Sequence, residues 1–174
     1  RFCDPEKRID VVFNYGLFDF SSPNFAWRFV TGQTDYAVAA YSTFDFFLEY
    51  QMENRAITEQ VLNLDQNEKI KLLDSLTINI RPENRIYRYN FIYKNCSTMP
   101  RDMISKAVNG KINYQWQGKY SSLRDEIHHF TNNYPWVQFG IDFVLGPKAD
   151  EIADLKSQQF APDVLSESFS KATI

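Results

Sequence analysis

The stretch from Asn95 to Asp102, NCSTMPRD, contains the residue types best suited to covalent chemistry. It lies where a strand-like aromatic run gives way to a helix-like pattern, so we expect Cys96 at a helix start and Thr98 in a supporting position. There the helix dipole and the free N–H groups of the first turn favour the thiolate, the form that attacks a carbonyl carbon. The same N–H groups are suited to stabilising an oxyanion. A buried structural cysteine near a helix cap fits the pattern equally well.

A general base is the second requirement of such a site, and the chain contains only two histidines, His128 and His129. Leu123, Ile127 and Phe130 mark the buried stripe of the helix predicted around them. At about 100° per residue, both imidazoles point away from that stripe. We therefore expect solvated helix residues at both positions.

Two acidic residues, Asp142 and Glu59, also stand out in the sequence. Neither has a second carboxylate placed to form an acid–base pair, and no spacing of His, Cys, Asp and Glu indicates a metal site. We predict capping or surface ion pairs for both residues, and we expect no cofactor.

The strands that would position these groups are predicted from apolar alternation and from β-branched and aromatic runs. These patterns indicate strands over Ile9–Tyr15, Thr34–Tyr41, Arg55–Leu62 and Arg85–Tyr93. In the last of these, the alternation places four rings on one face, those of Tyr87, Tyr89, Phe91 and Tyr93.

Helices are predicted from apolar spacing and capping residues. Ser42 with Asp45 and Asp65 with Glu68 are spaced as capping boxes, and the second helix should end before Pro82. Further helices are predicted over residues 24–30, 99–108, 122–131, 136–144, 149–160 and 162–172. The expected fold class is α+β, with a small antiparallel sheet and a helix-rich C-terminal half.

Composition sets outer limits on function. A length of 174 residues without repeats or linkers predicts one domain over residues 1–174, and a net charge of −3 gives no footprint for nucleic acid. There is no apolar run long enough to span a bilayer and no Lys/Arg cluster for anionic lipid. The aromatic share of 16% predicts packed core rings. An acyl-binding or membrane-facing surface is the alternative, which leaves peripheral membrane contact open.

The two cysteines, Cys3 and Cys96, do not form a disulfide framework. One bridge between them would be compatible with an oxidising compartment. The strand-like setting of Cys3 instead predicts a small buried hydrophobe.

Four stretches carry a family resemblance: FNYGLFDFSSPNFAWRFVTGQTDY (13–36), NRAITEQVLNL (54–64), RPENRIYRYNFIYKNCSTMPRD (81–102) and PWVQFGIDFVLG (135–146). In order they cover most of the chain, which resembles the bacterial Lnb-type family, whose members include lipoprotein N-acyltransferases, and especially its Bacteroides-like branch. The resemblance implies a papain-like core, permuted as in NlpC-type peptidases and lecithin retinol acyltransferase. It also implies a periplasmic or outer-envelope location.

By this resemblance Cys96 matches the family's nucleophile, and Asn95 is the residue before it. Arg101 and Asp102 match the polar pair that follows. Met99 departs from the pattern, because a basic residue is expected there in close relatives. The departure weakens any contact with an anion or a lipid headgroup from this position.

The family also carries a Gly-His pair just upstream of the segment that begins here with Arg1, and that histidine would be the general base. We expect it to have been removed with an N-terminal segment, not relocated. If it lies on a strand pairing with Ile9–Tyr15, Asn14 is the first candidate for the third triad member and Tyr15 the second. Turn chemistry beside Gly16 explains the same two residues.

Three functions remain open. The first is acyl transfer through a Cys96 thioester, with a lipid or lipoprotein as donor and an amine as acceptor. The second is hydrolysis of cell-wall peptides by an amidase or endopeptidase of the same design. The third is a non-catalytic envelope binding module. A deep apolar channel to Cys96 would favour acyl chains, and an open polar groove would favour peptides.

Overall fold

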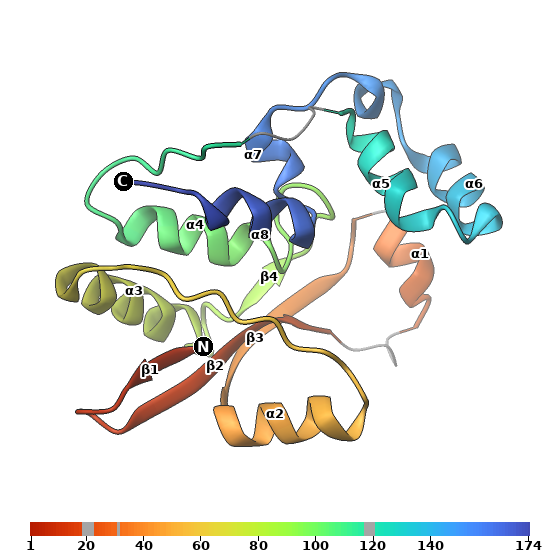
Figure 1. Ribbon diagram of the computed structural model, residues 1–174. Coiled ribbons are helices and arrows are strands. Elements are labelled where there is room, and N and C mark those ends of the chain that lie inside the picture. The colour runs from red at the N-terminus through yellow and green to blue at the C-terminus, as the bar shows by residue number, and fades with distance from the viewer. Residues whose placement is uncertain (19–22, 31, 117–120) are drawn as a thin grey trace.

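The computed structural model describes residues 1–18, 23–30, 32–116 and 121–174, and it has the α+β architecture expected from the sequence (Figure 1). A single antiparallel sheet has the strand order β1-β2-β3-β4. The strands are β1 (Phe2–Asp4), β2 (Ile9–Leu17), β3 (Asp35–Ser42) and β4 (Ile86–Arg88). The helices are α1 (Phe25–Val30), α2 (Thr43–Met52), α3 (Gln66–Asn79), α4 (Thr98–Ala107), α5 (Leu123–Thr131), α6 (Pro135–Val144), α7 (Leu155–Gln158) and α8 (Pro162–Ser170), with a 3-10 turn η1 (Pro147–Asp150) between α6 and α7.

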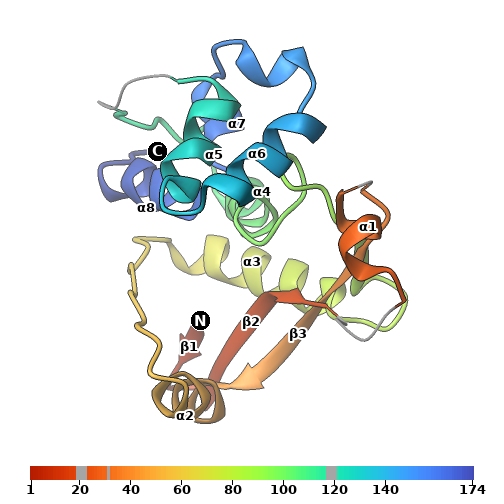
Figure 2. The same cartoon turned by 90° about the vertical axis from the view of Figure 1, so that its right-hand side faces the viewer.

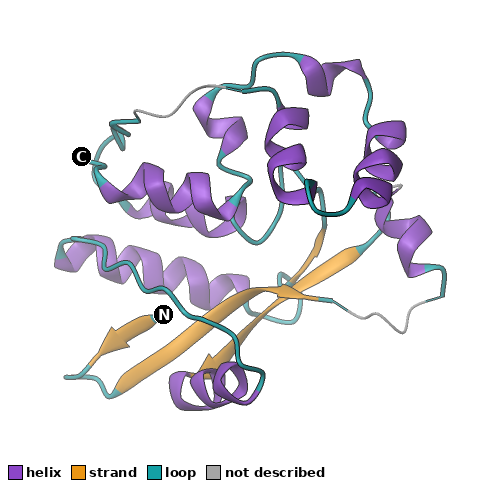
Figure 3. Cartoon of the chain, turned by 45° about the vertical axis from the view of Figure 1, so that its right-hand side comes forward, coloured by secondary structure: helices purple, strands orange, loops and turns teal. Residues whose placement is uncertain are grey.

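The sheet is built around the long antiparallel pair of β2 and β3. Their register runs from Val11 opposite Ser42 to Leu17 opposite Ala37, with a bulge between Asn14 and Leu17. β1 pairs only with the first part of β2, up to Phe2 opposite Val11. The strands therefore occupy one layer of the molecule, and most of the helices lie on one side of it (Figure 3).

The core between the sheet and α3 is rich in tyrosine. Its buried members are Tyr15, Tyr36, Val38, Leu76 and Tyr87. The Tyr15 hydroxyl donates to Asn79 Oδ1 at 2.8 Å, and the Tyr87 hydroxyl donates to the Tyr15 carbonyl. Burial raises the pKa of Tyr15 to about 12, so its phenol remains a hydrogen-bond donor at neutral pH. Because both hydroxyls have partners, these phenols can be buried without leaving a polar group unsatisfied.

A second core lies among the helices of the C-terminal half, in the upper layer of Figure 1. Its buried members are Leu123, Ile127, Ala149, Ala153, Phe160, Ala161 and Val164. Ile92, in the loop that follows β4, packs against this second core, whereas Tyr89 packs against the first. The loop between β4 and α4 therefore contacts both cores.

Helix α3 begins with the predicted capping box, which is confirmed. Asp65 Oδ1 accepts from the Glu68 N–H at 2.8 Å, and Glu68 Oε2 accepts from the Asp65 N–H at 2.9 Å. The other oxygen of the buried Glu68 carboxylate accepts from the Asn109 N–H at 2.7 Å. One side chain thus ties the start of α3 to the segment after α4.

The strand predicted over Arg55–Leu62 is wrong, because residues 55–65 form no regular secondary structure. Two apolar residues of this segment, Ile57 and Val61, are exposed. Side chains hold it in place: Arg1 Nη1 lies 3.1 Å from Glu59 Oε1, and the Gln60 amide donates to the Ser166 carbonyl. The segment has strand-forming residues, but it pairs with neither edge of the sheet, β1 or β4.

The strand predicted over Arg85–Tyr93 is shorter than expected, and a side chain explains why. Asn90 Oδ1 accepts from the N–H groups of Ile92 and Tyr93 at 3.1 and 2.9 Å. This Asx-type turn reverses the chain before the alternation is complete. Phe91 and Tyr93 are consequently exposed and are not part of a strand face.

Capping residues account for two further corrections. Ser42 makes no capping hydrogen bond, because it is the last residue of β3 and pairs with Val11. The helix predicted over residues 149–160 is divided between η1 and α7. Asp154 Oδ1 accepts from the Ser157 N–H at 2.8 Å and so begins a new helix within that range.

Replacing Glu68 with alanine is expected to lower the free energy of unfolding by about 1–3 kcal/mol, because the N–H groups of Asp65 and Asn109 lose their acceptor. Urea denaturation measures the change. Glu68→Gln keeps one acceptor oxygen and should cost less. Equal losses in the two variants would contradict this role of the carboxylate.

Candidate functional site

Cys96 lies immediately before Ser97, the N-cap residue of α4, and its side chain is exposed. The residues on either side, Asn95, Ser97 and Thr98, are all buried. The alternative of a buried structural cysteine is therefore excluded. The thiol is a surface group at the start of a helix, held between buried neighbours.

The Asn95 side chain fixes this arrangement. Its Oδ1 accepts from the N–H groups of Ser97 and Thr98, both at 2.9 Å, so it caps the helix in place of Ser97. Its Nδ2 donates to the carbonyls of Phe91 at 2.8 Å and Phe160 at 3.0 Å. Every hydrogen-bonding atom of the amide group is used, so the turn that contains Cys96 is rigidly placed.

These contacts correct the expectation that the first-turn N–H groups would serve as an oxyanion site. Those of Ser97 and Thr98 bind Asn95 Oδ1, and that of Met99 donates to the Asn95 carbonyl at 3.1 Å. Pro100 has no N–H. Within the described ranges, the Cys96 N–H makes no hydrogen bond to another residue, and it is the donor left available beside the sulfur.

Aromatic side chains of the sheet core lie within electrostatic range of Cys96. Tyr36 and Tyr89 stack with ring centroids 4.1 Å apart, and Tyr36 also contacts Tyr87 across the sheet. Burial raises the pKa of all three phenols, and negative charge on Cys96 raises them further. The sulfur is thus within electrostatic range of a tyrosine cluster formed by Tyr36, Tyr87 and Tyr89, with Met99 packed against the same core.

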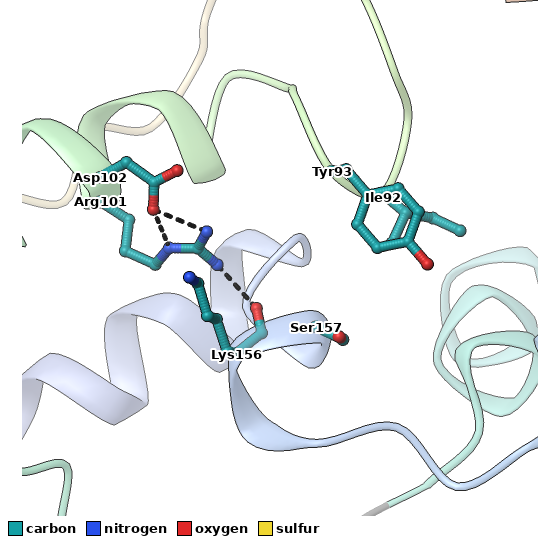
Figure 4. Close-up of a pocket in the computed structure, with 6 residues that line it drawn as sticks. All are labelled: Ile92, Tyr93, Arg101, Asp102, Lys156 and Ser157. Atoms are coloured by element: carbon teal, nitrogen blue, oxygen red, sulfur yellow. Dashed lines mark hydrogen bonds and ion pairs between the residues drawn. The ribbon is translucent and has the colours of Figure 1, made fainter.

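Arg101 and Asp102 face a small cavity of about 210 Å³, shown in Figure 4. The buried Arg101 guanidinium donates to the Lys156 carbonyl at 2.6 Å and pairs with Asp102 Oδ1. The arginine therefore joins α4 to α7. The cavity is lined by Ile92, Tyr93, Arg101, Asp102, Lys156 and Ser157, and Cys96 does not line it.

The candidate triad positions Asn14 and Tyr15 have other contacts. Asn14 Oδ1 accepts from the Gly16 N–H at 2.9 Å. Asn14 pairs with Ala39, so its side chain lies on the other face of the sheet from that of the buried Val38. Tyr15 is buried in the first core. The structure does not bring Asn14 to the tyrosine cluster near Cys96, and its role in a triad stays a prediction.

The second polar constellation joins α5 to α6. His128 Nε2 and Arg124 Nη1 lie 2.8 and 2.6 Å from Asp142 Oδ1, and Arg124 also pairs with Asp150. The predicted ion pair of Asp142 is confirmed, whereas His128 is not simply solvated. His129 is exposed. The helical spacing showed only that His128 points away from the α5 core stripe, and it gave no sign of the neighbouring helix that it meets.

Fold and site together define an α+β domain with a rigidly placed surface thiol. The chain belongs to the Lnb N-terminal periplasmic domain family, which residues 1–128 match. This assignment confirms the resemblance and a location in the periplasm or outer cell envelope. The matching region contains the whole sheet, α1 to α4 and Cys96, and it ends within α5. No curated protein and no solved structure matches the chain significantly.

Asn95→Ala is expected to lower the free energy of unfolding by about 2–4 kcal/mol, since it removes the cap of α4 and leaves buried N–H and C=O groups without partners. Urea denaturation measures the loss. Asn132→Ala, at the exposed C-terminal end of α5, is the matched control and should change stability by less than about 0.5 kcal/mol. A similar small effect at both positions would show that Asn95 does not hold the turn.

Asp142→Asn tests the α5–α6 constellation through pH. Hydrogen bonds from His128 and Arg124 hold the pKa of Asp142 below its ordinary value, so the charged carboxylate stabilises the fold above the ordinary pKa of about 3.9. That contribution is lost as the pH falls from there through the lowered pKa. The thermal midpoint of Asp142→Asn should lie below that of the wild type at pH 7, and the two should converge in acid.

The control for this comparison is Asp74→Asn, at an exposed position of α3. Its thermal midpoint should follow that of the wild type throughout the acid range. A gap between wild type and Asp142→Asn that stays constant down to the lowest pH would contradict the assigned pairing.

Proposed function

We propose that Cys96 is the nucleophile of a thiol-dependent acyl transfer on envelope lipids or lipoproteins. The observation that carries the proposal is the exposed thiol at the start of α4, flanked by buried residues that Asn95 holds in place. A nucleophile must be accessible to its substrate and fixed in direction at the same time. Both conditions are met at Cys96.

The proposed reaction has two steps. The Cys96 sulfur attacks the ester carbonyl of the donor, a C–S bond forms, the ester C–O bond breaks, and the alcohol leaves with a proton. An amine then attacks the thioester, the amide forms, and the thiol returns with the proton released by the amine. The Cys96 N–H and the positive end of the α4 dipole support the negative charge that develops on the carbonyl oxygen in both steps.

The surroundings of Cys96 favour an acyl donor. The tyrosine cluster of Tyr36, Tyr87 and Tyr89 lies within electrostatic range of the thiol, and Met99 adds a thioether to the same core. Rings and thioethers suit hydrocarbon chains better than charged peptide groups. Met99 stands where close relatives are expected to have a basic residue, and in this chain the position makes an apolar contact with the core instead.

Hydrolysis of a cell-wall peptide is the second candidate, and the cavity beside Arg101 favours it. Charged side chains line that cavity, together with Ser157. A polar peptide would find partners there. The cavity does not include Cys96, which makes this candidate weaker than acyl transfer.

The general base is the part of the mechanism that rests on the family resemblance alone. A strand that continued β1 upstream of Phe2 in the same register would lie along β2 beside Phe13 and Asn14. In a chain that carries the family's Gly-His segment, a histidine on such a strand would approach the bulged end of β2. Asn14 and Tyr15 are the residues we propose to test as its orienting partners.

Cys3 provides an internal reference for the reactivity of Cys96, because it is also free and exposed but lies on an edge strand. It is not the buried hydrophobe predicted from the sequence. In single-cysteine variants made by Cys3→Ser and Cys96→Ser, iodoacetamide should label Cys96 several-fold faster than Cys3 at neutral pH. The comparison is made on the 174-residue chain and on a chain that includes the Gly-His segment, and mass spectrometry follows the rate. Equal rates in the longer chain would count against both enzymatic candidates.

Acyl transfer itself is tested by incubating the longer chain with a diacyl phospholipid or a diacylated lipopeptide. Intact-mass measurement should show an acyl adduct that hydroxylamine removes and that is absent after Cys96→Ser. Release of peptide fragments from cell-wall material without an acyl adduct would favour the hydrolase.

A further inference from the structure

Helix α6 presents large apolar side chains to solvent along its whole length. Trp136 and Phe143 are each 85% exposed, and Phe139, Val137 and Val144 are exposed as well. None of the ten residues of the helix is buried. The largest apolar patch on a protein surface is often functional, so this surface indicates an interaction site.

The packing of α6 defines which side faces outward. Ile141, near its C-terminal end, and Leu145, just after it, pack against the second core. Trp136, Phe139 and Phe143 follow the spacing i, i+3 and i+7, which places them on one outward face of the helix. The helix lies at the periphery of the molecule in Figures 1 and 2. The exposed face therefore lies on the outside of the molecule.

The outward face of α6 carries no charge. Asp142 is the one ionisable residue of the helix, and its carboxylate is bound by Arg124 and His128 of α5. Hydrogen bonds from those two side chains also lower the pKa of Asp142, so the charge is compensated within the protein. Moving the outward face into an apolar phase would leave no unpaired charge without water.

Neighbouring elements extend the apolar surface. Tyr134, at the start of α6, and Phe130, at the end of α5, are exposed. Trp27 of α1 is exposed, and α1 and α6 lie along the same side of the molecule, the side that faces the viewer in Figure 2. Tryptophan and tyrosine at the edge of an apolar surface are typical of side chains that lie at the level of lipid headgroups.

The size and shape of α6 favour a bilayer over a second protein. A ten-residue helix is about 15 Å long and about 10 Å across, so its outward half offers on the order of 300 Å². Each partner of a standard protein interface buries about 800 Å². The outward face of α6 also carries no charged residue to orient a partner. Lipid chains adapt to the surface that they meet and require no complementary groove.

We propose that α6 lies in the interfacial region of a lipid bilayer, with Trp136, Phe139 and Phe143 inserted among the acyl chains and the helix parallel to the membrane plane. No helix among the described residues is long and apolar enough to cross a bilayer. The chain carries a net charge of −3 and α6 has no basic residue, so insertion depends on apolar contact. Binding should therefore be insensitive to salt and should not require anionic lipid.

The test is sedimentation of the full 174-residue chain with vesicles of phosphatidylcholine and phosphatidylethanolamine, at low and at high salt. The wild type should bind these vesicles at both salt concentrations, and added phosphatidylglycerol should not strengthen binding. Trp136→Ser with Phe143→Ser should weaken partition by at least about tenfold, because each change removes a large buried apolar side chain from the bound state. Binding that appears only with anionic lipid and disappears in salt would overturn the proposal.

The matched control removes a similar exposed apolar surface elsewhere. Phe44 and Met52 of α2 are 72% and 79% exposed, and α2 lies at the opposite end of the molecule from α6 (Figure 1). Phe44→Ser with Met52→Ser should leave partition within about twofold of the wild type. Equal weakening by the two double variants would show that the contact is not specific to α6.

Two further measurements test the depth of Trp136 in the bilayer and the oligomeric state of the chain. Brominated acyl chains should quench tryptophan emission in the wild type, and Trp136→Phe should remove most of the quenching even if the double variant is unstable. Analytical ultracentrifugation without lipid should show a monomer. A dimer that dissociates on Trp136→Ser would assign the face to a second copy of the chain and overturn the proposal. These readouts do not involve Cys96, so their failure leaves the proposed acyl transfer to its own test.

Discussion

The amide of Asn95 is the contact on which the candidate site depends. Its four hydrogen bonds join the loop after β4, the first turn of α4 and the carbonyl of Phe160 in the C-terminal half. A cap that used only local atoms would fix the direction of the helix but not its position. Because the same amide also reaches a residue sixty-five positions away, the turn that carries Cys96 is located relative to both hydrophobic cores.

The tyrosine core explains how the sheet supports that turn. Tyr15 and Tyr87 are buried with their hydroxyls bonded to Asn79 and to a strand carbonyl, so β2, β4 and the end of α3 are connected by polar contacts inside an apolar layer. A ring with a satisfied hydroxyl fills space and also fixes direction. The stacked pair of Tyr36 and Tyr89 belongs to the same layer and lies within electrostatic range of the thiol.

How much could be predicted from the sequence depends on the range of the interaction. The Asp65 cap and the helix start after Cys96 were predictable, because each is set by residues within one turn. The capping box predicted from the same spacing at Ser42 is wrong, because Ser42 is the last residue of β3 and pairs with Val11. That pairing is a contact between distant segments. Arg55–Leu62 has strand-forming residues but no pairing partner. The exposure of Cys96, the bond from Asn95 to Phe160 and the α5–α6 ion pairs all depend on tertiary packing, and no local pattern encodes them.

The two free thiols, those of Cys3 and Cys96, have a practical consequence for a protein of the periplasm. That compartment is oxidising, and accessible thiols there are exposed to disulfide exchange and to stepwise oxygenation. Cys3 lies on a short edge strand, where a second molecule can approach closely, whereas Cys96 lies between buried neighbours. Two molecules can thus join more easily through Cys3, whereas small oxidants should react with Cys96 first, and storage under a mild reductant would keep both thiols free.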